Sequence, residues 1–192
     1  MFTGLKNFLI FIFKYLLFWI LFFLFSRLLF VLFYLNFEIY GLKEKLLTFY
    51  YGFKLDLSSS AYLTLGATII FLLKSFVPRI NKIIKKIIFT YTYIFIVLIS
   101  ILIIADVHLY HYWGFRIYKN AINYLINPDE AFASVNILSI IIDLIGIFFL
   151  SIIFIKFFNI LLKEKINKDI KSNIPILIIY LLLTSILLIP IR

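Results

Sequence analysis

Five long apolar runs dominate this sequence, and they constrain its fold more than any other feature. They span residues 8–35, 57–77, 87–105, 137–162 and 174–190. Each approaches the length of about 20 residues with which an α-helix crosses a hydrocarbon core of about 30 Å. Lipid cannot satisfy an open backbone, and the runs lack the alternation of barrel strands, so helices are expected. We therefore predict an all-α membrane protein, a bundle of five transmembrane helices.

The composition leaves little room for anything else. Of the 192 residues, 65% are hydrophobic and only 15% are charged. A soluble catalytic domain usually needs about 100 residues or more. We therefore predict that residues 1–192 form one transmembrane domain, so that any activity lies in the membrane or at its surface, or belongs to a partner or a further part. The absence of cysteine excludes disulfides, thiolate metal sites and cysteine nucleophiles.

The distribution of basic residues predicts the orientation in the membrane. With the amino terminus inside, 12 of the 19 Lys and Arg residues lie at inner ends or in inner connections, and six lie outside. The positive-inside rule favours this arrangement. It places the amino terminus in the cytoplasm and Arg192 outside, in a multi-pass membrane protein. The net charge of +10 is thus assigned to topology rather than to nucleic-acid binding.

The two connections on the predicted outer face are rich in amphipathic sequence. Residues 41–51 place leucines at helical spacing between charged residues, which predicts a short helix lying in the interface. Residues 106–136 are rich in Tyr and Trp, which favour headgroup depth. We therefore expect short interfacial helices on the outer face.

Arg27 and Asp143 are charged residues that lie well inside their apolar runs. Arg27 and Asp143 lie about 13 Å and about 10 Å from the outer ends of their predicted helices, at a rise of about 1.5 Å per residue. A charge near mid-membrane costs at least about 2.5 kcal/mol, so each requires a partner or water. One hypothesis is that Arg27 and Asp143 pair across helices. The alternative is that Arg27 extends to the interface while Asp143 is protonated or hydrated.

Three cations on the predicted outer face are candidates for binding a lipid headgroup. Lys54, Arg116 and Lys119 lie among aromatic residues, where their charged groups could hold a lipid phosphate. The alternative is simple anchoring at the interface.

Two other groups of polar residues are more typical of structural roles than of a metal or catalytic site. Asp106, His108 and His111 lack the second cluster that a closed zinc site needs, so we predict no metal site. Asp56 and the serines at 58–60 precede an apolar run, which is typical of helix capping.

Two stretches resemble a known family. They are YGFKLDLSSSAYL at 51–63 and ADVHLYHYWGFRI at 105–117, continued by YLINPDEAFAS at 124–134. They resemble the membrane region of lipoteichoic acid synthase-like proteins, in the alkaline phosphatase and sulfatase superfamily. That family has five transmembrane helices with the amino terminus inside, followed by an outward-facing sulfatase-like domain. The order of spans predicted here is the same.

The resemblance implies an amino-terminal membrane anchor that presents phosphatidylglycerol-like lipid to a phosphoglycerol transferase or sulfatase domain. In the family, a threonine nucleophile and a divalent metal, commonly manganese, belong to that carboxyl-terminal domain. This sequence ends at Arg192 with the fifth predicted span, so no catalytic residue or cofactor can be assigned to it.

Two alternatives remain open. One is a stand-alone membrane scaffold or small transporter in which Arg27 and Asp143 line a path, although the sequence shows no inverted repeat. The other is the membrane region of a phosphoethanolamine transferase, which joins five spans to a related outer domain.

Overall fold

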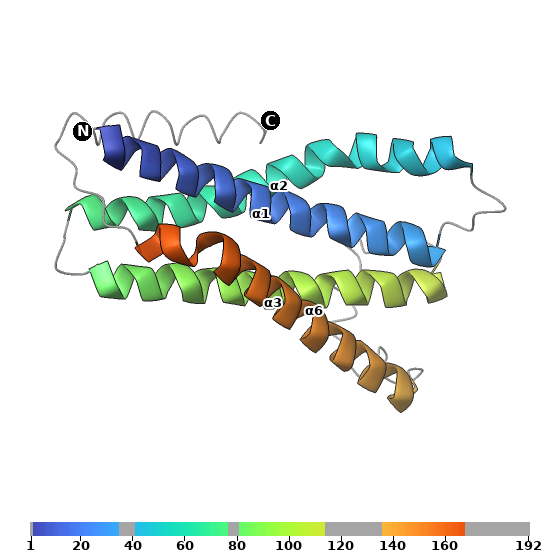
Figure 1. The fold of residues 1–192 in the computed structure, drawn as a ribbon. Helices are drawn as coiled ribbons and strands as arrows, with labels where there is room; N and C mark the ends of the chain where they lie inside the picture. The colour runs from blue at the N-terminus through green and yellow to red at the C-terminus, as the bar shows by residue number, and fades with distance from the viewer. Residues whose placement is uncertain (1, 35–40, 77–80, 114–135, 168–192) are drawn as a thin grey trace. The chain divides into compact units, whose positions relative to one another are not determined.

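A computed structural model describes residues 2–34, 41–76, 81–113 and 136–167, and all of its regular structure is α-helical. The helices are α1 (Phe2–Tyr34), α2 (Leu42–Phe76), α3 (Asn81–Trp113) and α6 (Ile137–Asn167) (Figure 1). Each is long and apolar enough to cross a membrane, with candidate spans at Gly4–Phe33, Leu42–Leu73, Asn81–Tyr110 and Ile137–Ile166. The chain is therefore a multi-pass membrane protein. The fifth predicted span, 174–190, lies outside the described residues.

The helices are longer than the apolar runs from which they were predicted. The expected interfacial helix at 41–51 and the span at 57–77 form one continuous helix, α2. A single glycine, Gly52, lies between them, and an isolated glycine costs a helix only about 1 kcal/mol. The prediction of a separate short helix there was wrong. In the same way, α3 continues past Ala105 and includes Asp106 and His108.

Local polar contacts define the helix starts. The Glu44 carboxylate accepts a hydrogen bond from the Gly41 amide at 2.8 Å, and the Glu44 amide donates to the Gly41 carbonyl at 3.1 Å. Asn136 caps α6, since its side-chain oxygen accepts a hydrogen bond from the Leu138 amide at 3.1 Å.

The chain divides into two compact units, which we describe separately. The first comprises residues 1–93 and 156–192 and contains α1, α2, the first part of α3 and the last part of α6. Phe11 stacks on Phe71 with ring centroids 4.1 Å apart, and Arg27 pairs with Asp56, so α1 and α2 run antiparallel.

The face of α2 that is buried carries small or short polar residues at every fourth position. These are Gly52, Asp56, Ser60, Thr64 and Thr68. The hydroxyls of Ser60, Thr64 and Thr68 each donate to the carbonyl four residues earlier, at 2.6–2.7 Å. In lipid, helices associate through close packing and internal hydrogen bonds, and small residues allow their backbones to approach. α1 contributes the large side chains, with Phe8, Phe11, Tyr15, Phe18, Trp19 and Phe22 all fully buried.

Phe158 of α6 lies at the centre of an aromatic cluster in the first unit. Its ring centroid lies 5.4–6.1 Å from those of Phe18, Phe89, Tyr15 and Tyr93, and its side chain is fully buried. The cluster therefore joins residues of α1, α3 and α6.

Hydrogen bonds connect the same three helices. The Tyr15 and Thr92 hydroxyls lie 2.7 Å apart, and the Tyr93 hydroxyl donates to the Asn159 side-chain oxygen at 2.9 Å. The Lys14 ammonium donates to the Leu161 carbonyl at 3.4 Å. These bonds fix the relative positions of the helices, which dispersion forces alone specify poorly.

The second unit comprises residues 94–155, and its described part pairs the end of α3 with the start of α6. His108 contacts Asp143, and the side chain of Ile104 lies against Gly146, where an added Cβ would come within 3.3 Å of it. From the first of these contacts to the second, residue numbers decrease along α3 and increase along α6, so the two segments run antiparallel.

We expect Phe158→Ala to lower the free energy of unfolding by about 3 kcal/mol, the lower end of the range for Phe→Ala in cores. The lower end applies because the side chain leaves a packed cluster for lipid and not for water. Reversible unfolding in mixed micelles would measure it. Ile160→Ala, at an 83% exposed position two residues away, is the control and should have little effect. Equal losses in the two variants would contradict the central role of Phe158.

Candidate functional site

The candidate site lies where the last turns of α1 meet the first turns of α2. Arg27 forms a two-pronged ion pair with Asp56, with Nη2 to Oδ1 at 2.7 Å and Nε to Oδ2 at 3.1 Å. Its Nη1 also donates to the Thr48 carbonyl at 3.3 Å. The two side chains are only 11% and 9% exposed. A paired geometry of this kind gives both energy and orientation, since the guanidinium fork matches the carboxylate.

Gly52 makes this ion pair possible. A Cβ at position 52 would lie within 1.9 Å of the Arg27 guanidinium carbon. The guanidinium therefore occupies the space of the missing side chain, between Thr48 one turn before and Asp56 one turn after. The glycine that interrupts the helix pattern in sequence thus has a packing role.

Arg27 and Asp143 each have a partner within their own unit, and because they lie in different units their mutual pairing stays a hypothesis. Arg27 pairs with Asp56, and the Asp143 carboxylate lies 3.1 Å from Nδ1 of His108. Both pairs are consistent with the cost of leaving a charge alone in lipid. The sequence predicted that Asp56 is a helix cap, and this prediction was wrong. Asp56 lies instead about 21 Å into α2, 14 residues after Leu42 at about 1.5 Å per residue.

Asp56 is the residue that the sequence analysis missed. A signal was available, since Gly52, Asp56, Ser60, Thr64 and Thr68 recur at four-residue intervals and so share one face of a helix. Ser60 donates its hydroxyl to the Asp56 carbonyl and does not take part in capping.

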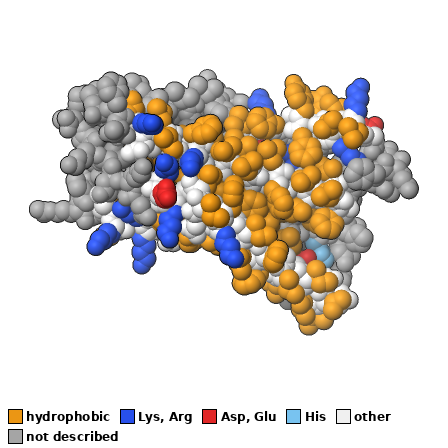
Figure 2. Space-filling model, viewed as in Figure 1, with side chains coloured by type: hydrophobic (Ala, Val, Ile, Leu, Met, Phe, Trp, Pro, Cys, Tyr) orange, Lys and Arg blue, Asp and Glu red, His pale blue; other side chains and the backbone are white. Residues whose placement is uncertain are grey.

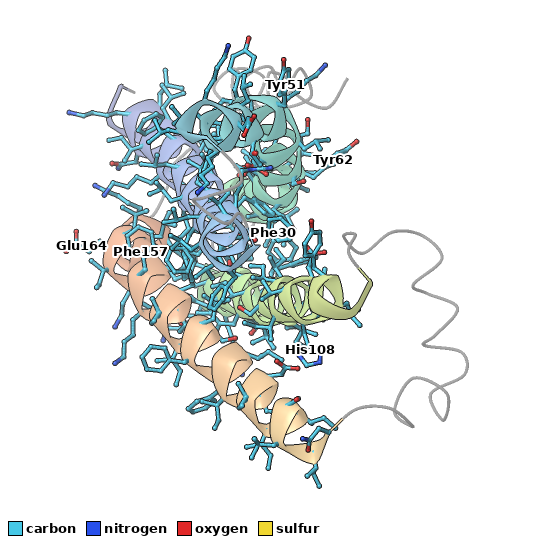
Figure 3. The ribbon with its side chains drawn as sticks, turned by 90° about the vertical axis from the view of Figure 1, so that its right-hand side faces the viewer. Phe30, Tyr51, Tyr62, His108, Phe157 and Glu164 are labelled. Carbon is cyan, nitrogen blue, oxygen red and sulfur yellow. The ribbon has the colours of Figure 1, made fainter. Side chains whose placement is uncertain are left out.

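The opposite face of these turns of α2 is exposed. Lys43, Leu47, Tyr50 and Lys54 follow one another at intervals of four, three and four residues, and all four are exposed. We call these four residues the α2 stripe. Tyr50 is 75% exposed, and its neighbour Tyr51, which is 71% exposed, points away from the helices in Figure 3. Figure 2 shows hydrophobic side chains over much of the visible face, which suits a lipid environment.

Only one of the three predicted headgroup cations can be placed. Lys54 is exposed on the α2 stripe, whereas Arg116 and Lys119 lie outside the described residues. Lys43 was not among the predicted cations, although its spacing of 11 residues from Lys54 places both on one helix face.

Asp106 and His108 lie on α3, and Asp106 is buried at 8% exposure. The side chain of His111 lies outside the described part of the chain. Among the described residues no group of three or more His, Cys, Asp or Glu could hold a metal ion. The contact between His108 and Asp143 gives this histidine a structural role between α3 and α6 (Figure 3).

Comparison of the chain with known protein families, curated proteins and solved structures finds no match.

The Arg27–Asp56 pair predicts strong energetic coupling between two positions. Arg27→Leu and Asp56→Leu should each lower the free energy of unfolding by about 3 kcal/mol, because each leaves a buried charge without its partner. The double variant should lose much less than the sum. Arg27→Leu combined with Asp143→Leu is the matched control and should be additive. Additive losses for Arg27 and Asp56, measured by unfolding in micelles, would exclude the pair.

Gly52 gives a second, independent test. Gly52→Ala should destabilise the protein, because the new methyl group displaces the guanidinium from Asp56. In an Arg27→Leu background the same change should have little further effect. Gly41→Ala is the control, since its Cβ would meet only the Glu44 carboxylate at 4.0 Å. An equal cost of Gly52→Ala with and without Arg27, measured as the thermal unfolding midpoint, would show that the guanidinium does not need this space.

Proposed function

We propose that this chain is the membrane region of a cell-envelope enzyme of the lipoteichoic acid synthase type, and that its α1–α2 end holds an anionic lipid headgroup. In this proposal the amino terminus is cytoplasmic, and the α2 stripe lies at the outer face of a bacterial inner membrane. The lipid is phosphatidylglycerol-like and serves a separate outward-facing sulfatase-like domain.

The α2 stripe is the observation that supports this proposal most directly. Two ammonium groups, Lys43 and Lys54, flank the exposed Tyr50 on one helix face. Lysine near a membrane surface attracts anionic lipid with about 1 kcal/mol per residue, and tyrosine favours headgroup depth. Leucine side chains next to the stripe, such as Leu46 at 59% exposed, give the same turns an apolar surface for acyl chains.

The Arg27–Asp56 pair supports the proposal because it holds the stripe in position. The same turns of α2 that carry Lys54 outward are bound to α1 through Thr48 and Asp56. A helix face fixed in this way loses little conformational entropy when it binds a ligand, and such preorganisation favours affinity.

The first stretch that resembles the lipoteichoic acid synthase-like family, residues 51–63, lies within α2. Within it, Gly52, Asp56 and Ser60 form the face of α2 that receives Arg27 and packs in the first unit. The resemblance therefore includes residue types that helix packing requires. The threonine nucleophile and the metal, manganese in this family, would belong to the separate domain and not to these helices.

Lipid binding can be tested in nanodiscs that contain phosphatidylcholine with or without phosphatidylglycerol. Phosphatidylglycerol should raise the unfolding midpoint of the unmodified chain. The Lys43→Ala/Lys54→Ala variant should lose most of this rise, because about 2 kcal/mol of electrostatic attraction is removed. Lys82→Ala/Lys86→Ala removes two exposed lysines from the start of α3 and should keep the rise.

Three other outcomes would contradict the proposal or favour one of its alternatives. A rise that survives Lys43→Ala/Lys54→Ala would contradict headgroup binding at the α2 stripe. An equal rise with phosphatidylethanolamine would favour the phosphoethanolamine transferase alternative. Solute flux through proteoliposomes that contain only this chain would favour a small transporter.

A further inference from the structure

Two buried serines in the second unit lack the hydrogen bond to their own helix that other buried hydroxyls make. Ser60, Thr64, Thr68 and Thr92 each donate to the backbone carbonyl four residues earlier. Ser100 and Ser151 are 0% and 7% exposed, and neither hydroxyl has a hydrogen-bond partner among the described residues. A buried hydroxyl without a partner costs about 1–3 kcal/mol, so helix residues normally avoid it.

The register of α3 and α6 places these two serines at the same level along the two helices. His108 lies against Asp143, and Ile104 lies against Gly146. Ser100 comes eight residues before His108, and Ser151 comes eight residues after Asp143. Both steps correspond to about 12 Å along a helix, in opposite chain directions. Because the two segments are antiparallel, the steps end at the same level of the interface.

We propose that Ser100 and Ser151 form a hydration site between α3 and α6, in which a water molecule bonds to both hydroxyls. A buried water needs two to four polar partners, and the two hydroxyls supply the minimum. Each serine can donate and accept, so one water satisfies both without a charge. The small size of the two side chains leaves room that leucine or isoleucine, which dominate these helices, would fill.

This site would add a polar level to an interface that already contains the His108–Asp143 pair. Exposed residues on the same part of α6 are apolar, such as Phe148 and Phe149 at 68% and 66% exposed. Hydrogen bonds between helices specify register in lipid, where apolar packing alone discriminates weakly. The inference is independent of the lipid-binding proposal, since it involves neither α1 nor α2.

Water can be detected directly by solid-state NMR of the full chain in bilayers, through magnetisation transfer from water protons. Ser100 and Ser151 should receive magnetisation rapidly, whereas Ser60, which is equally buried but bonded to the Asp56 carbonyl, should not. Transfer to Ser100 and Ser151 that is no faster than transfer to Ser60 would overturn the proposal.

Alanine variants give a second test through the sign of their effect. If water bridges the serines, Ser100→Ala or Ser151→Ala should lower the unfolding midpoint by about 2–4 °C, as expected for the loss of one hydrogen bond in a chain of this size. The double variant should lose less than the sum, because no unpaired hydroxyl remains. If the hydroxyls are simply unpaired, each alanine should raise the midpoint, and that result would overturn the proposal.

The placement at one level is testable because the sequence contains no cysteine. The pair Ser100→Cys/Ser151→Cys should be cross-linked by a short bifunctional thiol reagent, since a bridging water keeps the side chains farther apart than the Cβ separation of about 3.5–4.5 Å that a direct disulfide requires. Ser100→Cys/Ser139→Cys is the control, because Ser139 lies 12 residues from Ser151 on α6. Equal cross-linking of the two pairs, or none in the first, would overturn the placement.

Discussion

A charged group inside a membrane helix must find a partner, and this requirement organises the first unit of the protein. Arg27 cannot remain alone in α1, so α2 supplies the Asp56 carboxylate, the Thr48 carbonyl and the open space of Gly52. These contacts fix the register of α1 against α2. The aromatic side chains of α1 then meet the small and hydroxylated face of α2. The ion pair therefore determines which residues of α2 are buried and which, like Lys54, are exposed.

The same physical rule explains the other polar contacts. Buried hydroxyls on α2 bond to their own helix, while Tyr15 and Tyr93 bond between helices. His108 and Asp143 satisfy each other in the second unit. In water such contacts add little to the stability of a fold, but in lipid the hydrophobic effect does not hold helices together. Polar side chains and close packing then specify the arrangement.

Much of the fold was predictable from sequence, because apolar length is a local signal. Four of the five predicted spans correspond to described helices. The partner of Arg27 was not predictable by matching depths, because that argument requires the true helix ends. Because α2 extends back to Leu42, Asp56 lies inside the helix and not at its start as predicted. A four-residue polar repeat carried the missing information, but its meaning depended on knowing that the helix was continuous.

The pairing of Arg27 with Asp56 is the claim on which the rest depends. Solid-state NMR of the bilayer-embedded chain can measure dipolar coupling between the labelled guanidinium nitrogens of Arg27 and the carboxylate carbon of each aspartate. The account predicts strong coupling to Asp56, at the separation of about 4 Å or less that defines an ion pair, and none to Asp143. Coupling to Asp143, or to neither aspartate, would contradict it.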